Sequence, residues 1–420
     1  MMTSRRTAGQ VTISRRSALA VTVATVVAAT SGYLILVVAA RTLGPVDYGR
    51  FSVFWALYFG VLGILFGVQQ EATRAVSADA TAPKPGSSFK AVRVVPISFA
   101  IGGAFAGLLG ATAVAWAPRV FPAETASLAT IVVVASILYA GQTGMLGSLS
   151  GSRQWSAFAA ILTVEALVRL AAVLAAAAWG FGVGGLALAT ATAASAWLAV
   201  TAANPSARQA WHARGDVSAR SFVKRTCSTM LAATASATLV VGFPVLLQVT
   251  TPGGLGSTGG ALVLAITLTR APLLVPLNAL QGVAISHFVS HRATGVRVLV
   301  QPALVLATIG MAGATAAWLL GRPIMVAAFG PGFAVDPGVL AALIGGATLI
   351  AALTLTGSAV VAFERHRAFA AGWVLASAVS IGVLLTNLPL TERAVLSLTI
   401  GPLAGVAVHV TTLTRRRSRR

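Results

Sequence analysis

Charged residues are scarce in this chain of 420 residues, because Asp, Glu, Lys and Arg together make up only 9% of it. A typical soluble globular protein has about 25%. Since 57% of the residues are hydrophobic, a soluble fold would expose large apolar patches, and the composition excludes one. Cysteine is almost absent as well. The single Cys227 excludes an intramolecular disulfide, and we expect it to be a small packing residue.

The apolar residues form twelve long runs, each close to the roughly 20 residues that a membrane-spanning helix needs. None shows the alternating pattern of a membrane β-barrel. The runs cover 18–40, 49–70, 93–117, 127–150, 156–179, 181–203, 227–250, 259–286, 298–320, 337–363, 368–388 and 394–414. The polar connections are too short to hold a soluble catalytic domain. We therefore predict an all-α polytopic membrane protein that is not an enzyme.

The distribution of cations predicts which way the chain crosses the membrane. With a cytoplasmic N-terminus, 23 of the 30 Lys and Arg residues fall in cytoplasmic segments, five on the other side and two inside spans. Such an excess marks cytoplasmic loops, and it requires an even number of spans. We expect both termini in the cytoplasm and a multi-pass protein of a bacterial cytoplasmic (inner) membrane. The net charge of +21 then reflects contact with anionic membrane lipids, and no nucleic-acid partner is expected.

The chain divides near its midpoint. An Arg-rich segment that begins at Asn204-Pro205 separates six spans from six. The predicted parts are a basic tail (1–17), an N-lobe (18–203), a cytoplasmic linker (204–226), a C-lobe (227–414) and a second basic tail (415–420). Pro118–Pro122 and Phe329–Phe333 occupy equivalent places in the two halves. An even number of spans in each half makes the repeats parallel, as in two-lobed transporters. The twin arginines before the first span precede a run too long for a signal peptide, so we expect an uncleaved helix.

Glu165 and Arg169 are ionisable residues inside the fifth span, four positions apart on one helix face. Ionisable residues in a membrane are costly and often functional. Two interpretations are open. The residues form a structural pair that neutralises itself, or they line an aqueous cavity in which Arg169 contacts an anionic ligand.

Arg270 lies inside the eighth span without an acidic residue within a helical turn. Pro272 and Pro276 follow, and each removes a backbone donor and disturbs the helix. Two amides come next, Asn278 and Gln281. A guanidinium beside a broken helix suits an anion such as phosphate. The alternatives are an interhelical bridge to Glu165 or a side chain that reaches towards water.

Other polar clusters have simpler explanations. Glu71 and Arg74, at the cytoplasmic boundary of the second span, are typical of interfacial anchors. His287 and His291 lack a third ligand, so no metal site is expected. The sequence contains no Walker motif, and no cofactor is expected.

Residues 40–51 read Ala-Arg-Thr-Leu-Gly-Pro-Val-Asp-Tyr-Gly-Arg-Phe. This segment resembles the turn between the first two spans of Wzx-like polysaccharide flippases, which belong to the multidrug/oligosaccharidyl-lipid/polysaccharide (MOP) transporter superfamily. Two further stretches, 147–169 and Phe329–Phe333, resemble the same family. The resemblance implies two six-helix lobes around a central cationic cavity. Arg41 matches the turn, and the Glu165 and Arg169 pair matches the fifth span. Arg270 has the character of a cavity cation.

The resemblance also implies a function. We expect alternating access to move a polyprenyl-pyrophosphate-linked oligosaccharide to the outer leaflet, with glycosyltransferases and a glycan polymerase as possible partners. The candidate substrate-binding residues are Arg270, Arg169, Glu165, Arg41, Asn278 and Gln281. One alternative is a small-molecule or multidrug exporter of the same superfamily. A less favoured one is a membrane-embedded glycan polymerase or ligase, which would need larger charged external loops.

Overall fold

The structure is a computed structural model that describes residues 14–81, 91–290 and 297–414. Its long elements are all helices. The first half contains α1 (Arg15–Thr81), α2 (Val94–Ala111), α3 (Ala113–Val120), α4 (Thr125–Gly151), α5 (Trp155–Ala178), α6 (Val183–Thr192), α7 (Ala196–Ala203) and α8 (Pro205–Trp211). The second half contains α9 (Ala219–Val240), α10 (Phe243–Val249), α11 (Gly256–Ser290), α12 (Val300–Ala316), α13 (Arg322–Phe329), α14 (Pro337–Ala362), α15 (His366–Leu384) and α16 (Leu390–Thr414).

These helices confirm the predicted fold class, an all-α polytopic membrane protein. In the described part of the chain, ten helices are long and apolar enough to cross a membrane. Dividing α1 at its kink gives two spans from one helix, and the α9–α10 pair occupies the region of the predicted seventh span. The surface agrees with this class, because α12 and α13 expose large apolar side chains that include Leu304, Met311 and Ile324. Lipid solvates such a surface, whereas water would not.

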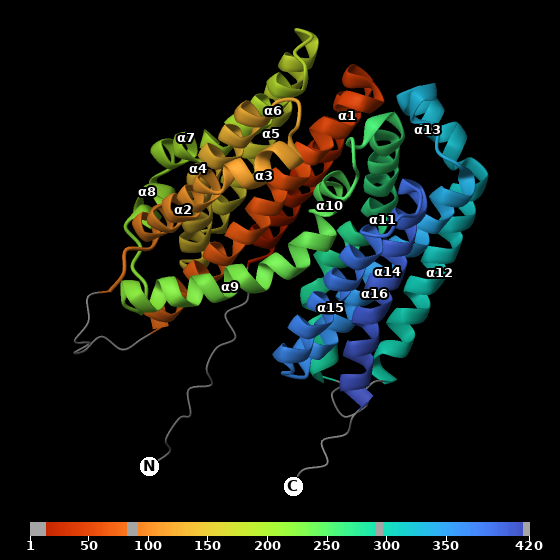
Figure 1. Ribbon diagram of the computed structural model, residues 1–420. Coiled ribbons are helices and arrows are strands. Elements are labelled where there is room, and N and C mark those ends of the chain that lie inside the picture. The colour runs from red at the N-terminus through yellow and green to blue at the C-terminus, as the bar shows by residue number, and fades with distance from the viewer. Residues whose placement is uncertain (1–13, 82–90, 291–296, 415–420) are drawn as a thin grey trace, which may run out of the picture.

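The helices form two bundles that lie side by side, as Figure 1 shows. Helices α1 to α8 make up the first bundle, and α10 to α16 make up the second. Helix α9 runs obliquely across the end of the first bundle towards the second. The boundaries proposed for the lobes and linker remain predictions, and the basic tails lie largely outside the described residues.

Gly44 reverses the direction of α1, which the sequence predicted as two spans joined by a longer turn. Gly44 alone leaves the helical conformation, with φ 69° and ψ 175°. A side chain is strained at this positive φ, whereas glycine adopts it freely, and Pro45 then starts the next helical segment. Arg16 and Ser156 line the same surface pocket, and Ser77 Oγ donates a hydrogen bond to the carbonyl of Gly151. Both halves of α1 therefore reach the same end of the bundle.

The two bundles touch closely at the end that contains Gly44, called here the Gly44 end. A Cβ on Gly260 of α11 would overlap the carbonyl oxygen of Pro45, so only glycine permits this backbone approach. The ring of Tyr48 packs edge-on against that of Phe333, with the ring centres 5.7 Å apart. The Arg41 Nε donates a hydrogen bond of 2.6 Å to the carbonyl of Ala328. The turn predicted as a family signature therefore fastens the first bundle to the second.

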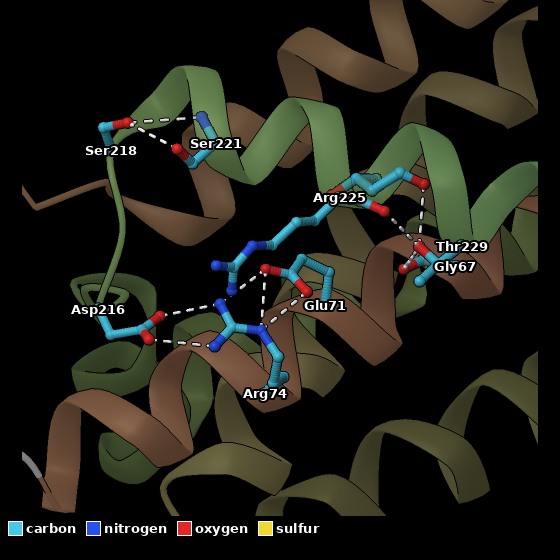
Figure 2. A network of polar contacts seen from close by, with 9 residues as sticks. Gly67, Glu71, Arg74, Asp216, Ser218, Ser221, Arg225 and Thr229 are labelled. Carbon is cyan, nitrogen blue, oxygen red and sulfur yellow. Dashed lines mark hydrogen bonds and ion pairs between the residues drawn. The ribbon is translucent and has the colours of Figure 1, made fainter. Parts of the chain in front are cut away.

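At the opposite end, an ion network joins the end of α1 to the segment before α9 (Figure 2). We call Glu71, Arg74 and Asp216 the Arg74 network, and its end of the molecule the Arg74 end. The Arg74 guanidinium donates to both oxygens of Glu71 at 2.9 and 3.1 Å, and to both oxygens of Asp216 at 2.9 and 3.0 Å. Further along α9, Thr229 Oγ1 donates to the Gly67 carbonyl at 2.9 Å. These bonds hold the first half of α9 against α1.

We predict that Arg74→Met lowers the free energy of unfolding by about 2–3 kcal/mol, because Glu71 is buried and would lose its partner. The Arg225 side chain extends from α9 towards Glu71 in Figure 2. Asp216→Asn is the matched control, and its cost should stay near 1 kcal/mol or less because Asp216 is partly exposed. Denaturant unfolding of the purified protein measures both. Equal losses of stability in Arg74→Met and Asp216→Asn would contradict the larger contribution assigned to the buried Glu71–Arg74 pair.

Candidate anion site between the two bundles

A cavity of about 340 Å³ lies between the two bundles. The first bundle contributes both halves of α1 and Arg169 of α5, while α9, α10 and α11 contribute the facing wall with Arg270. Aromatic side chains of α1 line the cavity, among them Tyr33, Trp55 and Phe59. Two arginines predicted independently from the sequence therefore line one cavity, one from each bundle.

Arg169 is held by side chains of the first bundle. It forms a buried ion pair with Glu165, whose second oxygen accepts a 2.6 Å hydrogen bond from Gln142 Nε2 of α4. The guanidinium lies 5.0 Å from the centre of the Phe59 ring, a cation–π contact. Its Nε has no partner in the described structure. The ion pair is thus self-neutralising, and its arginine also lines the cavity.

Arg270 is held differently. Its Nη1 donates to the carbonyls of Leu239 and Val240 at 3.2 and 3.3 Å, where α9 ends. The guanidinium lies 5.1 Å from the centre of the Phe243 ring. The residue is 7% exposed, and neither Nε nor Nη2 has a hydrogen-bond partner in the described structure. Its contacts are with backbone and an aromatic ring, and Glu165 is occupied by other partners.

The remaining candidates are placed elsewhere or are not described. Arg41 binds the Ala328 carbonyl at the Gly44 end and is not among the residues that line the cavity. The side chains of Asn278 and Gln281 lie outside the described part of the structure. Sequence reasoning missed Gln142, although an amide in the apolar helix α4 was a usable signal. It also missed Phe59 and Phe243, because nothing in a sequence shows which aromatic rings will lie beneath arginines.

The arrangement leaves buried donors without partners on the two arginines that line the cavity. Two guanidinium groups and one carboxylate leave a net positive charge around the cavity, and N–H groups on both arginines are unused. Guanidinium edges bind the oxygens of phosphate or carboxylate groups in pairs, most strongly where water is excluded. Among the described residues, no three His, Cys, Asp or Glu side chains come together as metal ligands would.

Solved structures with the same fold are membrane transporters. The chain aligns with an inward-facing multidrug resistance MATE family transporter of the MOP superfamily at a TM-score of 0.70 and 15% identity, over 93% of this chain and 96% of that one. It aligns with the lipid II flippase MurJ, in an inward closed conformation, at a TM-score of 0.66 and 13% identity, over 95% of this chain and 87% of that one. The protein thus has the fold of the MOP superfamily transporters.

Sequence relatives are found in mycobacteria. The chain is 38% identical to the uncharacterized protein Rv1510 of Mycobacterium tuberculosis over 405 residues, 96% of this chain and 93% of that protein. It is 37% identical to the uncharacterized protein Rv3630 of the same organism over 403 residues, 93% of this chain and 90% of that protein. The chain belongs to the same family as these mycobacterial proteins. No protein-family model matches it.

Proposed function

We propose that the protein is a transporter that flips a polyprenyl-pyrophosphate-linked oligosaccharide from the cytoplasmic to the outer leaflet of a bacterial cytoplasmic membrane. One observation carries the proposal: Arg169 and Arg270, from different bundles, line one cavity and both have unused N–H groups. A pyrophosphate has oxygens enough to bind both guanidinium edges. The likeness of residues 40–51 to Wzx-like flippases and the fold shared with MurJ support the same substrate class.

The proposed substrate explains why such a cavity is needed. A glycan headgroup and a charged pyrophosphate cannot cross hydrocarbon without a polar route, whereas the prenyl tail can remain in lipid. Two arginines lower the cost for the pyrophosphate and still permit release. The Arg74 end faces the cytoplasm in this proposal, in line with the excess of cations there. Glycosyltransferases that make the headgroup and a polymerase that consumes it are the expected partners.

Alternating access would require the close contact at the Gly44 end to open. In this structure Gly260 and Pro45 touch there, so the two bundles are joined at the side proposed to face outward. Separation of these backbones while the Arg74 end closes would expose the arginines to the other side of the membrane. The fold shared with a multidrug transporter supports one alternative, a small-molecule exporter. The cationic cavity favours an anionic substrate over the cations that such exporters are expected to exchange.

Reconstitution tests the proposal directly. Vesicles containing the protein and a fluorescent polyprenyl-pyrophosphate glycan should move the lipid across the bilayer faster than empty vesicles. Arg169→Gln and Arg270→Gln should each slow transport at least about tenfold, the cost of one lost charge-assisted interaction. Arg322→Gln, an exposed arginine outside the cavity, is the control and should transport normally. Transport no faster than in empty vesicles, under every ion gradient tried, would refute the flippase.

A further inference from the structure

The end of α9 is a break in the backbone at the wall of the cavity. Pro244 has no N–H to offer the Val240 carbonyl four residues earlier, so the helical ladder cannot continue. The amides of Val241 and Gly242 both turn back to the Ala237 carbonyl, each at 2.9 Å. Helix α10 then starts at Phe243. The break therefore leaves carbonyls at the end of α9 that need donors from elsewhere.

One nitrogen of Arg270, on α11, donates to those carbonyls. Its Nη1 bonds the carbonyls of Leu239 and Val240, and its guanidinium plane is supported by the Phe243 ring. The other edge of the guanidinium, Nε and Nη2, is buried without a partner. Because a guanidinium carries five donors in one rigid plane, one edge can bind carbonyls while the other binds an oxyanion.

The junction between α9 and α10, to which Arg270 is bonded, contacts both bundles. Before the break, α9 is bonded to α1 through Thr229 and Gly67. At the break, Leu239 packs with Leu353 and Trp373 of the second bundle. A group that fixes the position of this junction therefore acts where the two bundles meet.

We propose that Arg270 couples occupation of the cavity to the order of the α9–α10 junction. An anion on the free edge holds the guanidinium in place, and the same rigid plane then holds the Leu239 and Val240 carbonyls. The effect is reciprocal, so an ordered junction also presents the free edge for binding. This proposal rests on the anion site of the proposed function. It adds a way in which an anion bound there affects the packing of the two bundles.

Arg169 is the internal comparison. It lines the same cavity and carries the same charge, but its described hydrogen-bond partner is the Glu165 side chain on its own helix. Loss of Arg169 should weaken anion binding without removing the link to the backbone break. The two arginines can therefore be separated by experiment, because only Arg270 should affect the junction at saturating ligand.

Hydrogen exchange of the full-length protein with inorganic pyrophosphate tests the coupling. In the wild type, saturating pyrophosphate should slow amide exchange in residues 241–249 about tenfold, a usual size for coupling between sites. Arg270→Lys keeps the charge but not the planar fork, and should bind pyrophosphate without slowing exchange. Arg169→Lys should need more pyrophosphate but reach the wild-type slowing. Pro244→Ala restores an amide donor for the Val240 carbonyl. In this variant, amides 241–249 should exchange slowly even without pyrophosphate.

The outcomes separate the two proposals. Pyrophosphate binding to the wild type without slower exchange in 241–249 overturns the coupling and leaves the anion site intact. Equal slowing in Arg270→Lys also overturns the coupling. No pyrophosphate binding to the wild type removes the anion site and the coupling with it. Binding with slower exchange, but without lipid transport, supports the coupling and contradicts only the flippase.

Discussion

Replacing Glu165 by leucine will lower the free energy of unfolding by about 3–5 kcal/mol, the cost of leaving a buried charge without its partner. Arg169 is buried, and Glu165 provides its only described ion pair. The substitution also removes the acceptor for Gln142 Nε2, which adds the cost of an unsatisfied buried amide. Thermal or denaturant unfolding in one detergent measures the change.

The double variant Glu165→Leu/Arg169→Met is the matched control. Removing both charges should restore stability to within about 1–2 kcal/mol of the wild type, because a buried pair can be replaced by apolar groups at little cost. It should nevertheless lose most pyrophosphate binding, since one of two cavity cations is gone. Normal binding by the stable double variant would assign the pair a structural role only. A Glu165→Leu variant as stable as the wild type would contradict the expected cost of an unpaired buried charge at Arg169.

Replacing Gly260 by valine should open the Gly44 end. The new Cβ would overlap the Pro45 carbonyl, and overpacking of this kind costs about 1–3 kcal/mol. The conformation with touching bundles would be disfavoured by about 5- to 150-fold relative to one in which they separate. A cysteine at Thr267, which lines the cavity, reports the change when Cys227, the only native cysteine, is replaced by serine. In the Gly260→Val variant, an impermeant maleimide added outside the cell should label the cysteine at position 267 faster than in the parent.

Gly345→Val controls for the general effect of valine in place of a helical glycine. Gly345 is exposed on α14, and a Cβ there would meet no other atom within 4 Å. Its labelling rate at position 267 should match that of the parent. Unchanged labelling in a folded Gly260→Val variant would mean that the contact at the Gly44 end does not limit access to the cavity.

The sequence was sufficient for the class of fold because hydropathy acts residue by residue along the chain. Long apolar runs predicted the helices, and the cost of charge in a membrane selected Arg169 and Arg270. The sequence could not show that both arginines line one cavity, because α5 and α11 are about a hundred residues apart and meet only through packing. The sequence also could not decide whether Glu165 and Arg169 form a structural pair or line a cavity. The structure shows that Arg169 does both.

Details of the backbone were harder to predict. The turn at 41–48 was expected to be longer, but Gly44 alone makes the reversal, since one residue with positive φ suffices. Pro272 and Pro276 pointed to a broken helix at Arg270, whereas α11 is assigned as helix throughout and the break lies in the neighbouring α9–α10 segment. Pro244 was the relevant signal. Its importance depends on which side chain reaches the freed carbonyl, and that is a property of the folded structure.

The placement of α9 has a consequence for how the protein assembles during synthesis. This helix is the first long element of the second half to be synthesised, and α1, which it contacts, is by then complete. Thr229 can therefore meet Gly67, and Asp216 can meet Arg74, before α11 to α16 have been made. Contacts between the two halves can therefore begin to form while the second half is still being made, since chains generally fold from the N-terminus during synthesis.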